Sequence, residues 1–401
     1  MFILILTLLL NGFLPVWLPP ITIALLVMLF ITRGLRRRSF TGATPADWPL
    51  LLLLLFLPLG ILISPQRALT LDRSYALVAA AALFWLIAAQ RNQPWLRHSG
   101  WLLLLAGAGL ALAVLAFTTF PGQLPLVGLD ISVLQARSTT LLVRPGRFNP
   151  NLSGSLVALS LVPALVFTVY GVNRLQRLLA LLLSLLLALL LYLSQSRGAQ
   201  LGVLISIPLL IMLVNRRWLW LWLPLGVLIL VAALIFHDTL ATLLFTGNNV
   251  FSMLSGRQEL WSRAFYLIQD FPLTGVGMGA PEAVINTLYP TLIISRDMNW
   301  GHVHNAYLQM AAEMGIFGLV AWLAWLFSVG AAGIKRAASN IADVQRSLAL
   351  ALTGSWLVFV VHGFVDVPLA SPKLMVLFFG LMGLLMAVTA SDRVSDRRGD
   401  A

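Results

Sequence analysis

The chain has 401 residues, of which 60% are hydrophobic and only 10% are charged, and its mean hydropathy is +0.93. A soluble globular protein has roughly 45–50% apolar and about 25% charged residues, so this composition excludes a water-soluble protein. The formal net charge is +12 and there is no cysteine, which excludes disulfides, thiol nucleophiles and thiolate metal sites.

Long apolar runs recur along the whole chain, and a helix needs about 20 apolar residues to cross a bilayer. The stretch 2–32 is interrupted by Asn11, Gly12 and three prolines, and we interpret it as two short helices, with one broken helix as the alternative. It lacks a basic segment and a small-residue cleavage site, which favours a retained helix over a signal peptide. Further spans are predicted at 49–64, 74–90, 100–119, 151–171, 176–194, 198–214, 217–236, 305–334, 347–367 and 372–390. The expected fold is an all-α integral membrane protein with about twelve transmembrane helices.

The basic residues orient these spans. Sixteen of the 26 fall in alternate short gaps, and Lys and Arg gather in cytoplasmic loops. Both termini, including a tail at 391–401, are therefore predicted to be cytoplasmic, and the net charge reflects topology rather than a nucleic-acid partner. The gaps at about 120–150 and 237–303, the longest between spans, are then predicted to lie outside. The second is expected to be a short helical external (periplasmic) loop domain between helices 9 and 10. The whole chain, 1–401, is expected to be a single membrane domain. No cytoplasmic loop could hold a nucleotide-binding domain, so the chemistry is expected on the outer face.

Ten basic residues stand on the side that this topology rule disfavours. Arginine binds phosphate through two parallel hydrogen bonds, so the group as a whole favours an anionic ligand. Each one alone is equally explained by solvation or by pairing with a nearby acid. The ten are Arg67, Arg73, Arg137, Arg144, Arg147, Arg197, Arg257, Arg263, Arg296 and Lys373.

Two of these arginines have informative surroundings. Arg197 lies in SQSRGAQLG, a short polar link between two apolar runs, where anion binding competes with simple snorkelling to the interface. Ser255 followed by Gln258 is a capping-box pattern, which predicts a helix that begins there and ends at Phe271-Pro272. Arg257 would then lie in the first turn beside free backbone N–H groups, with Trp261 on the same face, and both features favour a phosphate.

The next motifs are a glycine string and a histidine pair. Gly275, Gly277 and Gly279 follow no predicted strand, so we interpret them as a tight turn rather than a dinucleotide fingerprint. His302 and His304 have no third ligand at metal-binding spacing nearby, which disfavours a metal. His304-Asn305 opens the helix 305–334, where the positive helix N-terminus favours a neutral imidazole that can act as a general base, or else a local cap.

Two acidic residues, Glu313 and Asp366, lie near these motifs in the sequence or are paired with a further histidine. Glu313 is predicted to point to the opposite helix face and to pair within the bundle. His362 and Asp366 have the i, i+4 spacing of a single helix face, so they either orient a catalytic group from behind or join two helices.

At these residues the chain resembles the O-antigen ligase and polymerase superfamily. The resemblance rests on SRGAQLG, GRQELWSRAFYLIQDFPLTGVGMG and HVHNAYLQMAAEMGIFGL, in that order and with a large outer loop between. It implies transfer of a glycan from an undecaprenyl-diphosphate carrier to an acceptor sugar, without metal or other cofactor and with inversion at the anomeric carbon. The acceptor would be lipid A-core or another glycan, at the outer face of the bacterial inner membrane.

The resemblance also implies roles for individual residues. Arg197 and Arg257 would bind the diphosphate leaving group, and His304 would deprotonate the acceptor hydroxyl. Further substrate contacts are expected from a second set, with His362 and Asp366 behind the catalytic group. The second set is Arg144, Arg147, Trp261, His302 and Asn305.

Three alternatives remain open. A polymerase would transfer the glycan to another lipid-linked repeat, and the residues do not separate it from a ligase. A transporter or flippase of lipid-linked sugars would need polar groups near the bilayer midplane, whereas here they gather at the outer edge. A purely structural membrane scaffold leaves the ordered arginines and histidines unexplained.

Overall fold

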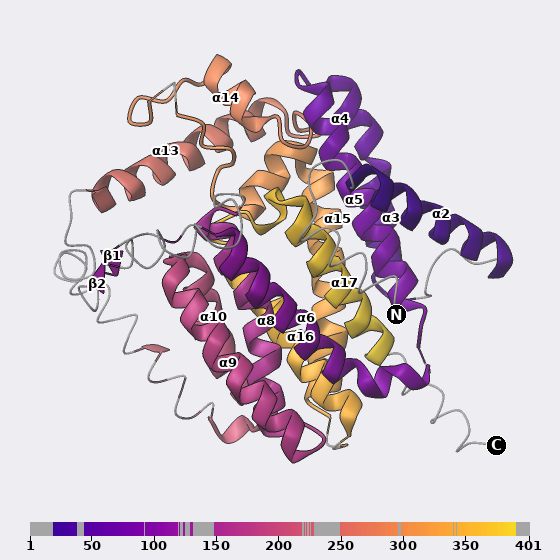
Figure 1. Ribbon diagram of the computed structural model, residues 1–401. Coiled ribbons are helices and arrows are strands. Elements are labelled where there is room, and N and C mark those ends of the chain that lie inside the picture. Colours follow the sequence, from indigo (N-terminus) through magenta and orange to yellow (C-terminus); the bar gives the residue numbers. More distant parts are fainter. Residues whose placement is uncertain are drawn as a thin grey trace.

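The protein is an all-α integral membrane protein, as its composition predicts. The computed structural model describes residues 19–37, 44–91, 93–118, 148–218, 249–295, 298–339 and 343–389, with a few isolated positions between these ranges. In this part of the chain most residues are helical (Figure 1), and eight helices are long and apolar enough to cross a membrane. The remaining predicted spans are short, broken or outside the described residues, so the total of twelve stays a prediction.

The eight long helices follow the apolar runs of the sequence. Several begin at a side chain that caps free backbone N–H groups, as Asn149, Asn173 and Asp343 do, because such residues stabilise helix starts. The eight are α5 (Arg67–Ala88), α6 (Ser99–Phe117), α8 (Pro150–Tyr170), α9 (Arg174–Ser194), α10 (Arg197–Val214), α15 (Ala306–Ala337), α16 (Val344–His362) and α17 (Pro372–Thr389).

The shorter elements fill the spaces between them. The predicted span 49–64 is divided at Phe56 into α3 (Asp47–Leu55) and α4 (Leu57–Ile63), because Pro58 lacks the N–H that a continuous helix needs. Of the predicted spans 2–32 and 217–236, only α2 (Pro19–Arg37), η2 (Arg216–Trp218) and isolated helical positions are described. The other short elements are η1 (Pro94–His98), η3 (Pro368–Ala370) and the antiparallel pair β1 (Gln123–Leu124) and β2 (Leu129–Asp130).

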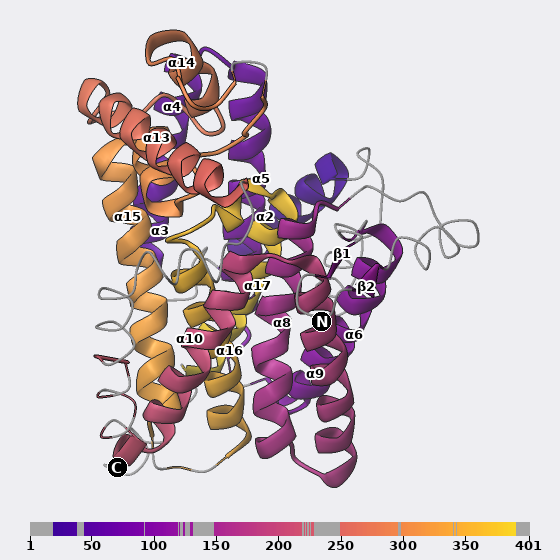
Figure 2. The same ribbon diagram turned by 90° about the vertical axis from the view of Figure 1, so that its left-hand side faces the viewer.

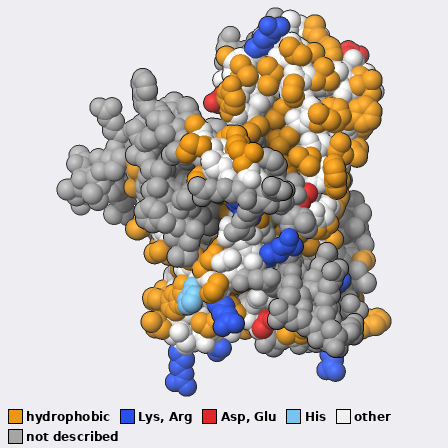
Figure 3. Space-filling view, turned by 90° about the vertical axis from the view of Figure 1, so that its right-hand side faces the viewer, with side chains coloured by type: hydrophobic (Ala, Val, Ile, Leu, Met, Phe, Trp, Pro, Cys, Tyr) orange, Lys and Arg blue, Asp and Glu red, His pale blue; other side chains and the backbone are white. Residues whose placement is uncertain are grey.

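The core of the bundle is formed by α5, α8, α15, α16 and α17, each of which packs against at least one of the others. Aromatic rings fill its centre: Trp325 stacks on Phe379 with ring centroids 4.3 Å apart, and Phe359 stacks on Phe378 at 3.8 Å. Hydrophobic side chains also cover much of the described outer surface (Figure 3). A protein that is apolar both inside and outside is suited to a lipid environment.

Two further helices lie across one end of the bundle. They are α13 (Asn249–Asp270) and α14 (Pro281–Leu288), and both fall within the predicted external loop. Figures 1 and 2 show them above the beginning of α15. We call this the histidine end, because it carries His302, His304 and His362. The chain leaves it along α5, α8, α10, α15 and α17 and returns to it along α6, α9 and α16.

Helix α15 is interrupted at Gly315. The turn that contains Gly275, Gly277 and Gly279, which we call the glycine turn, supplies the hydrogen bonds that the interruption leaves unmade. Gly315 has φ +66° and ψ −173°, so Ile316 N–H turns to the carbonyl of Pro272 instead of Ala312. The carbonyl groups of Ala312 and Glu313 accept hydrogen bonds from residues 276 and 277 in the glycine turn, at 3.0 and 2.9 Å. The glycine string is therefore a turn, as predicted, and it serves the backbone of a membrane helix.

Replacing Gly315 by alanine is expected to destabilise the protein by at least about 2 kcal/mol. The backbone conformation is one that only glycine adopts readily, and a Cβ there would collide with the Leu273 carbonyl. Gly256→Ala in α13 is the control, because its Cβ would stand 3.4 Å from the nearest atom, a side-chain carbon of Ile294. Melting in detergent measures the difference, and equal melting temperatures for the two variants would contradict this account.

Candidate functional site

The site is built around a short loop before α15, residues 301–305, which we call the histidine loop. It begins at Gly301, with φ +68°, and His304 also has a positive φ of +53°, which is uncommon for a residue with a side chain. Asn305 ends the loop by capping α15, where its side-chain oxygen accepts from the N–H groups of Tyr307 and Leu308 at 3.0 Å. The loop therefore turns sharply and presents His304 directly ahead of a helix start.

Both histidines of the loop contact a single carboxylate, that of Asp366. His302 Nε2 lies 2.9 Å and His304 Nδ1 lies 3.1 Å from Asp366 Oδ1, and the two imidazole centroids are 4.5 Å apart. Helix α16 ends at His362 rather than continuing to residue 367 as predicted. Phe364, Val365 and Asp366 form a turn directly after it, with N–H groups bonded to the Val361 and His362 carbonyls. His362 Nε2 stands 3.8 Å from Asp366 Oδ2, too far for a hydrogen bond.

Asp366 is held as a carboxylate. Its burial would raise the pKa, but the neighbouring His302, His304 and His362 outweigh burial and hold the pKa of Asp366 well below its ordinary value of 3.8. The backbone N–H of Val367 also donates to Oδ1 at 2.9 Å. A charged acceptor bonded to His304 Nδ1 fixes the orientation of that imidazole.

Hydrogen bonds hold the backbone of the histidine loop on both sides. Val303, between the two histidines, donates its N–H to Gln309 Oε1 at 3.0 Å and accepts at its carbonyl from Trp261 Nε1 at 2.9 Å. The side chain of Asn305 donates to the Phe364 carbonyl at 3.1 Å. Trp261 and Asn305, predicted as substrate contacts, therefore have positioning bonds in this structure.

Arg257 does not have the predicted setting. Helix α13 begins at Asn249, so Arg257 is in the helix interior and not in a first turn beside free N–H groups. The capping-box prediction is wrong because nothing in VFSML, which precedes Ser255, stops a helix. Arg257 shares a face with Trp261, one turn away. No hydrogen bond or ion pair of its own is found within the described residues, so its guanidinium is available to a ligand.

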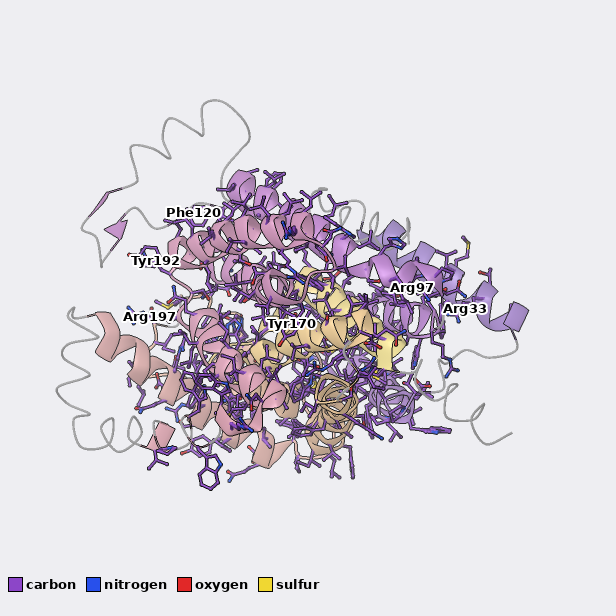
Figure 4. All side chains as sticks on the ribbon, turned by 90° about the horizontal axis from the view of Figure 1, so that it is seen from below. Arg33, Arg97, Phe120, Tyr170, Tyr192 and Arg197 are labelled. Carbon is purple, nitrogen blue, oxygen red and sulfur yellow. The ribbon has the colours of Figure 1, made fainter. Side chains whose placement is uncertain are left out.

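Arg197 lies at the histidine end of a different helix, α10. It is the first residue of α10, exposed at the histidine end, and the next residue, Gly198, packs so tightly on His362 that a Cβ would lie 2.8 Å from its ring. In Figure 4, Arg197 and Tyr192 lie toward one side of the bundle, and Arg33 and Arg97 toward the other. Arg144 and Arg147 lie outside the described residues.

Residues 182–323 match the model of the family described as O-antigen ligase. The match covers 142 of the 401 residues and shows what this segment is similar to. No curated protein matches the chain. The ligase-family segment runs from α9 into α15, so it includes Arg197, Arg257 and His304, whereas Asp366 lies beyond it in the sequence. The match supports a membrane glycosyltransferase of the ligase or polymerase kind.

Sequence spacing missed the partner of the ligase-family histidines. Asp366 was paired with His362 by their i, i+4 spacing, and no third ligand was expected near His302 and His304. The folded chain brings one donor atom each from His302, His304 and Asp366 within 4.8 Å of one another. These three residues could hold a metal ion, so the expected absence of metal rests on the resemblance alone.

Glu259 organises the part of the ligase-family segment that lies between α13 and α15. Its carboxylate accepts from the backbone N–H groups of Leu292, Ile293 and Ile294 at 2.5 to 3.1 Å, and Arg263 stands 3.6 Å away. Burial would raise the pKa of Glu259, but the backbone hydrogen bonds and Arg263 together lower it below 4.5. Its stabilising effect is therefore present above pH 4.5 and is lost as the pH falls through the lowered pKa.

An apolar cavity of about 350 Å³ lies between α6, α8 and α17. Helix α8 packs against both of the others. The lining runs from Lys373 at the histidine end to Leu384, which is roughly 16 Å along α17. The Lys373 ammonium stands 4.5 Å from the Phe148 ring centroid. The cavity is long and apolar, with a cation at the histidine end, and so suits an anionic amphiphile.

Proposed function

We propose that this protein transfers a glycan from undecaprenyl diphosphate to a hydroxyl of an acceptor sugar, as an O-antigen ligase, at the outer face of the bacterial inner membrane. The observation that carries the proposal is the contact of His304 Nδ1 with the Asp366 carboxylate, at the end of the bundle where Arg257 and Arg197 also lie. A base and two cations are what a diphosphate-leaving glycosyl transfer needs.

The proton path follows from the hydrogen bond. If His304 Nδ1–H donates to Asp366, Nε2 of the neutral ring is the acceptor. It takes the proton of the acceptor hydroxyl as that oxygen attacks the anomeric carbon. The bond from that carbon to the phosphate oxygen breaks, the diphosphate leaves with the electron pair, and the configuration inverts. The Asp366 carboxylate stabilises the imidazolium that forms.

The arginines stabilise the negative charge that develops on the diphosphate leaving group. Arg257 is one turn of α13 from Trp261, whose indole bonds the histidine loop, and Arg197 begins α10 beside Gly198, which packs on His362. Guanidinium groups bind phosphate oxygens in pairs of hydrogen bonds, and such electrostatic stabilisation is a large part of catalysis by transferases. We assign them to the diphosphate, with Arg144 and Arg147 as further contacts, whereas His302 remains open between substrate binding and orientation of Asp366.

The apolar cavity supports a lipid-linked donor. A polyprenyl chain is long and apolar and carries its diphosphate at one end. The cavity offers an aliphatic lining with Lys373 at the end nearest the site. Transfer of the chain from lipid into this groove would cost little, and the cation would favour the end that bears phosphate.

The proposal is tested with purified protein in liposomes. Labelled glycan on undecaprenyl diphosphate is supplied with lipid A-core or with a second lipid-linked glycan, and product is separated by size. Transfer to lipid A-core supports the ligase, and chain growth on the second donor supports the polymerase alternative. Donor that crosses the membrane without any covalent product would overturn both in favour of a flippase. A chelator in parallel reactions tests whether His302, His304 and Asp366 hold a metal.

Arg257→Lys is expected to lower the transfer rate by roughly 10²-fold. Lysine keeps the charge but loses the paired hydrogen bonds to phosphate. Arg263→Lys is the matched control, since Arg263 lies on the same helix but is paired with Glu259, and we expect it to stay within about twofold of wild type. Initial rates at saturating acceptor measure both, and equal rates would remove Arg257 from the leaving-group site.

A further inference from the structure

A small polar cavity lies directly behind the histidine loop. Its volume is about 30 Å³, and both Gly301 and Ala306, at the two ends of that loop, line it. One water molecule needs roughly 10–15 Å³ of such space, so the cavity has room for about two. Its polar walls come from three parts of the chain, namely Arg73 of α5, Gly279 of the glycine turn, and Gln309, Glu313 and Trp322 of α15.

Two hydrogen-bond donors in these walls have no partner within the described residues. They are Arg73 Nη1 and Trp322 Nε1, and both atoms are buried. Trp322 is only 1% exposed. Buried donors are nearly always hydrogen-bonded in folded proteins, because a donor removed from water without a replacement is costly. Two such donors on one cavity indicate an acceptor inside it.

The carboxylate of Glu313 stands in the same wall. Its Oε1 accepts from Gly279 N–H at 2.8 Å and from Gln309 Nε2 at 2.7 Å, so the prediction that Glu313 pairs within the bundle is confirmed. No hydrogen bond reaches Oε2 within the described residues, and Arg73 forms no direct ion pair with it. A carboxylate this deep needs a compensating charge, and Arg73 is the cation that shares its cavity.

We propose that this cavity is a hydration site. One or two water molecules accept hydrogen bonds from Arg73 Nη1 and Trp322 Nε1 and donate to Glu313, which makes Arg73 and Glu313 a water-bridged ion pair. Water fits because it can accept from the two unpartnered donors and donate to the carboxylate at the same time. The pair joins α5, the glycine turn and α15 at one point.

The ion pair also positions the histidines. Glu313 holds the amide group of Gln309, and Gln309 Oε1 accepts from the Val303 N–H between His302 and His304. Loss of the charge balance at Glu313 is expected to release Gln309 and then the loop. Arg73, Gln309 and Glu313 are thus positioning residues, and only this link to the reaction rests on the proposed function.

A pair of tryptophan substitutions tests the water. Trp322→Phe removes an N–H that the proposal bonds to water, so it is expected to lower the melting temperature by about 2 °C or more. Trp325→Phe is the matched control, since Trp325 is equally buried on the same helix and its Nε1 is also unpartnered, but it does not line the cavity. Equal effects of the two substitutions would show a dry cavity and overturn the proposal.

A double-mutant cycle tests the ion pair. Arg73→Gln and Glu313→Gln are each expected to reduce transfer roughly tenfold and to speed hydrogen–deuterium exchange in a peptide covering 301–305. The double variant should recover most of both losses, because neither charge is then left alone. Arg67→Gln, at an exposed position of the same helix, should change nothing.

Hydrogen–deuterium exchange in the histidine loop is measured without substrate. It therefore tests the water-bridged ion pair independently of whether the protein transfers a glycan. Recovery of slow exchange in the double variant supports the ion pair even if no glycan transfer is detected. The proposal would be overturned if the losses of the two single variants simply added in the double variant. It would also be overturned if the single variants sped exchange in peptides of α9 as much as in the 301–305 peptide.

Discussion

Replacing His304 by alanine is expected to reduce glycan transfer by roughly 10²–10⁴-fold, the usual contribution of a general base. The reduction should appear in kcat, because the imidazole takes up the proton only as the new bond forms. His98→Ala is the matched control, since His98 is exposed in η1 at the opposite end of the bundle. Rates near wild type for the purified His304→Ala protein would remove His304 as the base.

Asp366→Asn is expected to be nearly as harmful although it changes only one atom. An asparagine amide that donates to His304 Nδ1 would leave the proton on Nε2, so the ring could no longer accept one from the hydroxyl. A loss of roughly 10²–10⁴-fold in kcat is expected. Asp72→Asn, at an exposed position of α5, should leave the rate unchanged. Full activity of the Asp366→Asn protein would show that the tautomer of His304 does not matter.

Asp366 itself should add no pH dependence to the wild-type rate near neutral pH. A carboxyl group with a pKa well below 3.8 is charged at every pH above that value and loses its effect only as the pH falls through its lowered pKa. A difference infrared spectrum of wild type against Asp366→Asn should therefore show no protonated carboxyl band between about pH 5 and pH 8. The appearance of such a band within this range would assign a titrating role to Asp366 that its surroundings do not support.

The membrane helices were predictable because hydropathy is local. The apolar runs at 151–171 and 176–194 became α8 and α9 with boundaries within two residues, since only a helix satisfies its backbone in lipid. The errors came where a local signal met tertiary structure. Ser255 and Gln258 look like a helix start, yet α13 begins six residues earlier, at Asn249.

The site was predictable as a set of residues but not as an arrangement. His304, Arg197 and Arg257 stood out because they are cations or bases beside apolar spans. Asp366 was noticed only as a partner of His362, whereas its hydrogen bonds go to two histidines more than 60 residues earlier in the chain. Such pairing depends on where α16 ends, and the turn after His362 leaves little trace in hydropathy. Gln309 and Arg73 gave no local signal for their places behind the loop.

The interruption of α15 at Gly315 has a practical consequence for exchanging parts between relatives. The stretch that begins at Ala306 takes its backbone partners at Ala312 and Glu313 from the glycine turn and not from the helix that follows. Residues 272–315 thus form one transplantable module, although a hydropathy plot would place its border at residue 305. A graft of this module joined at Gly315 should keep the turn on the carbonyl groups it serves, whereas one joined at residue 305 would separate the two.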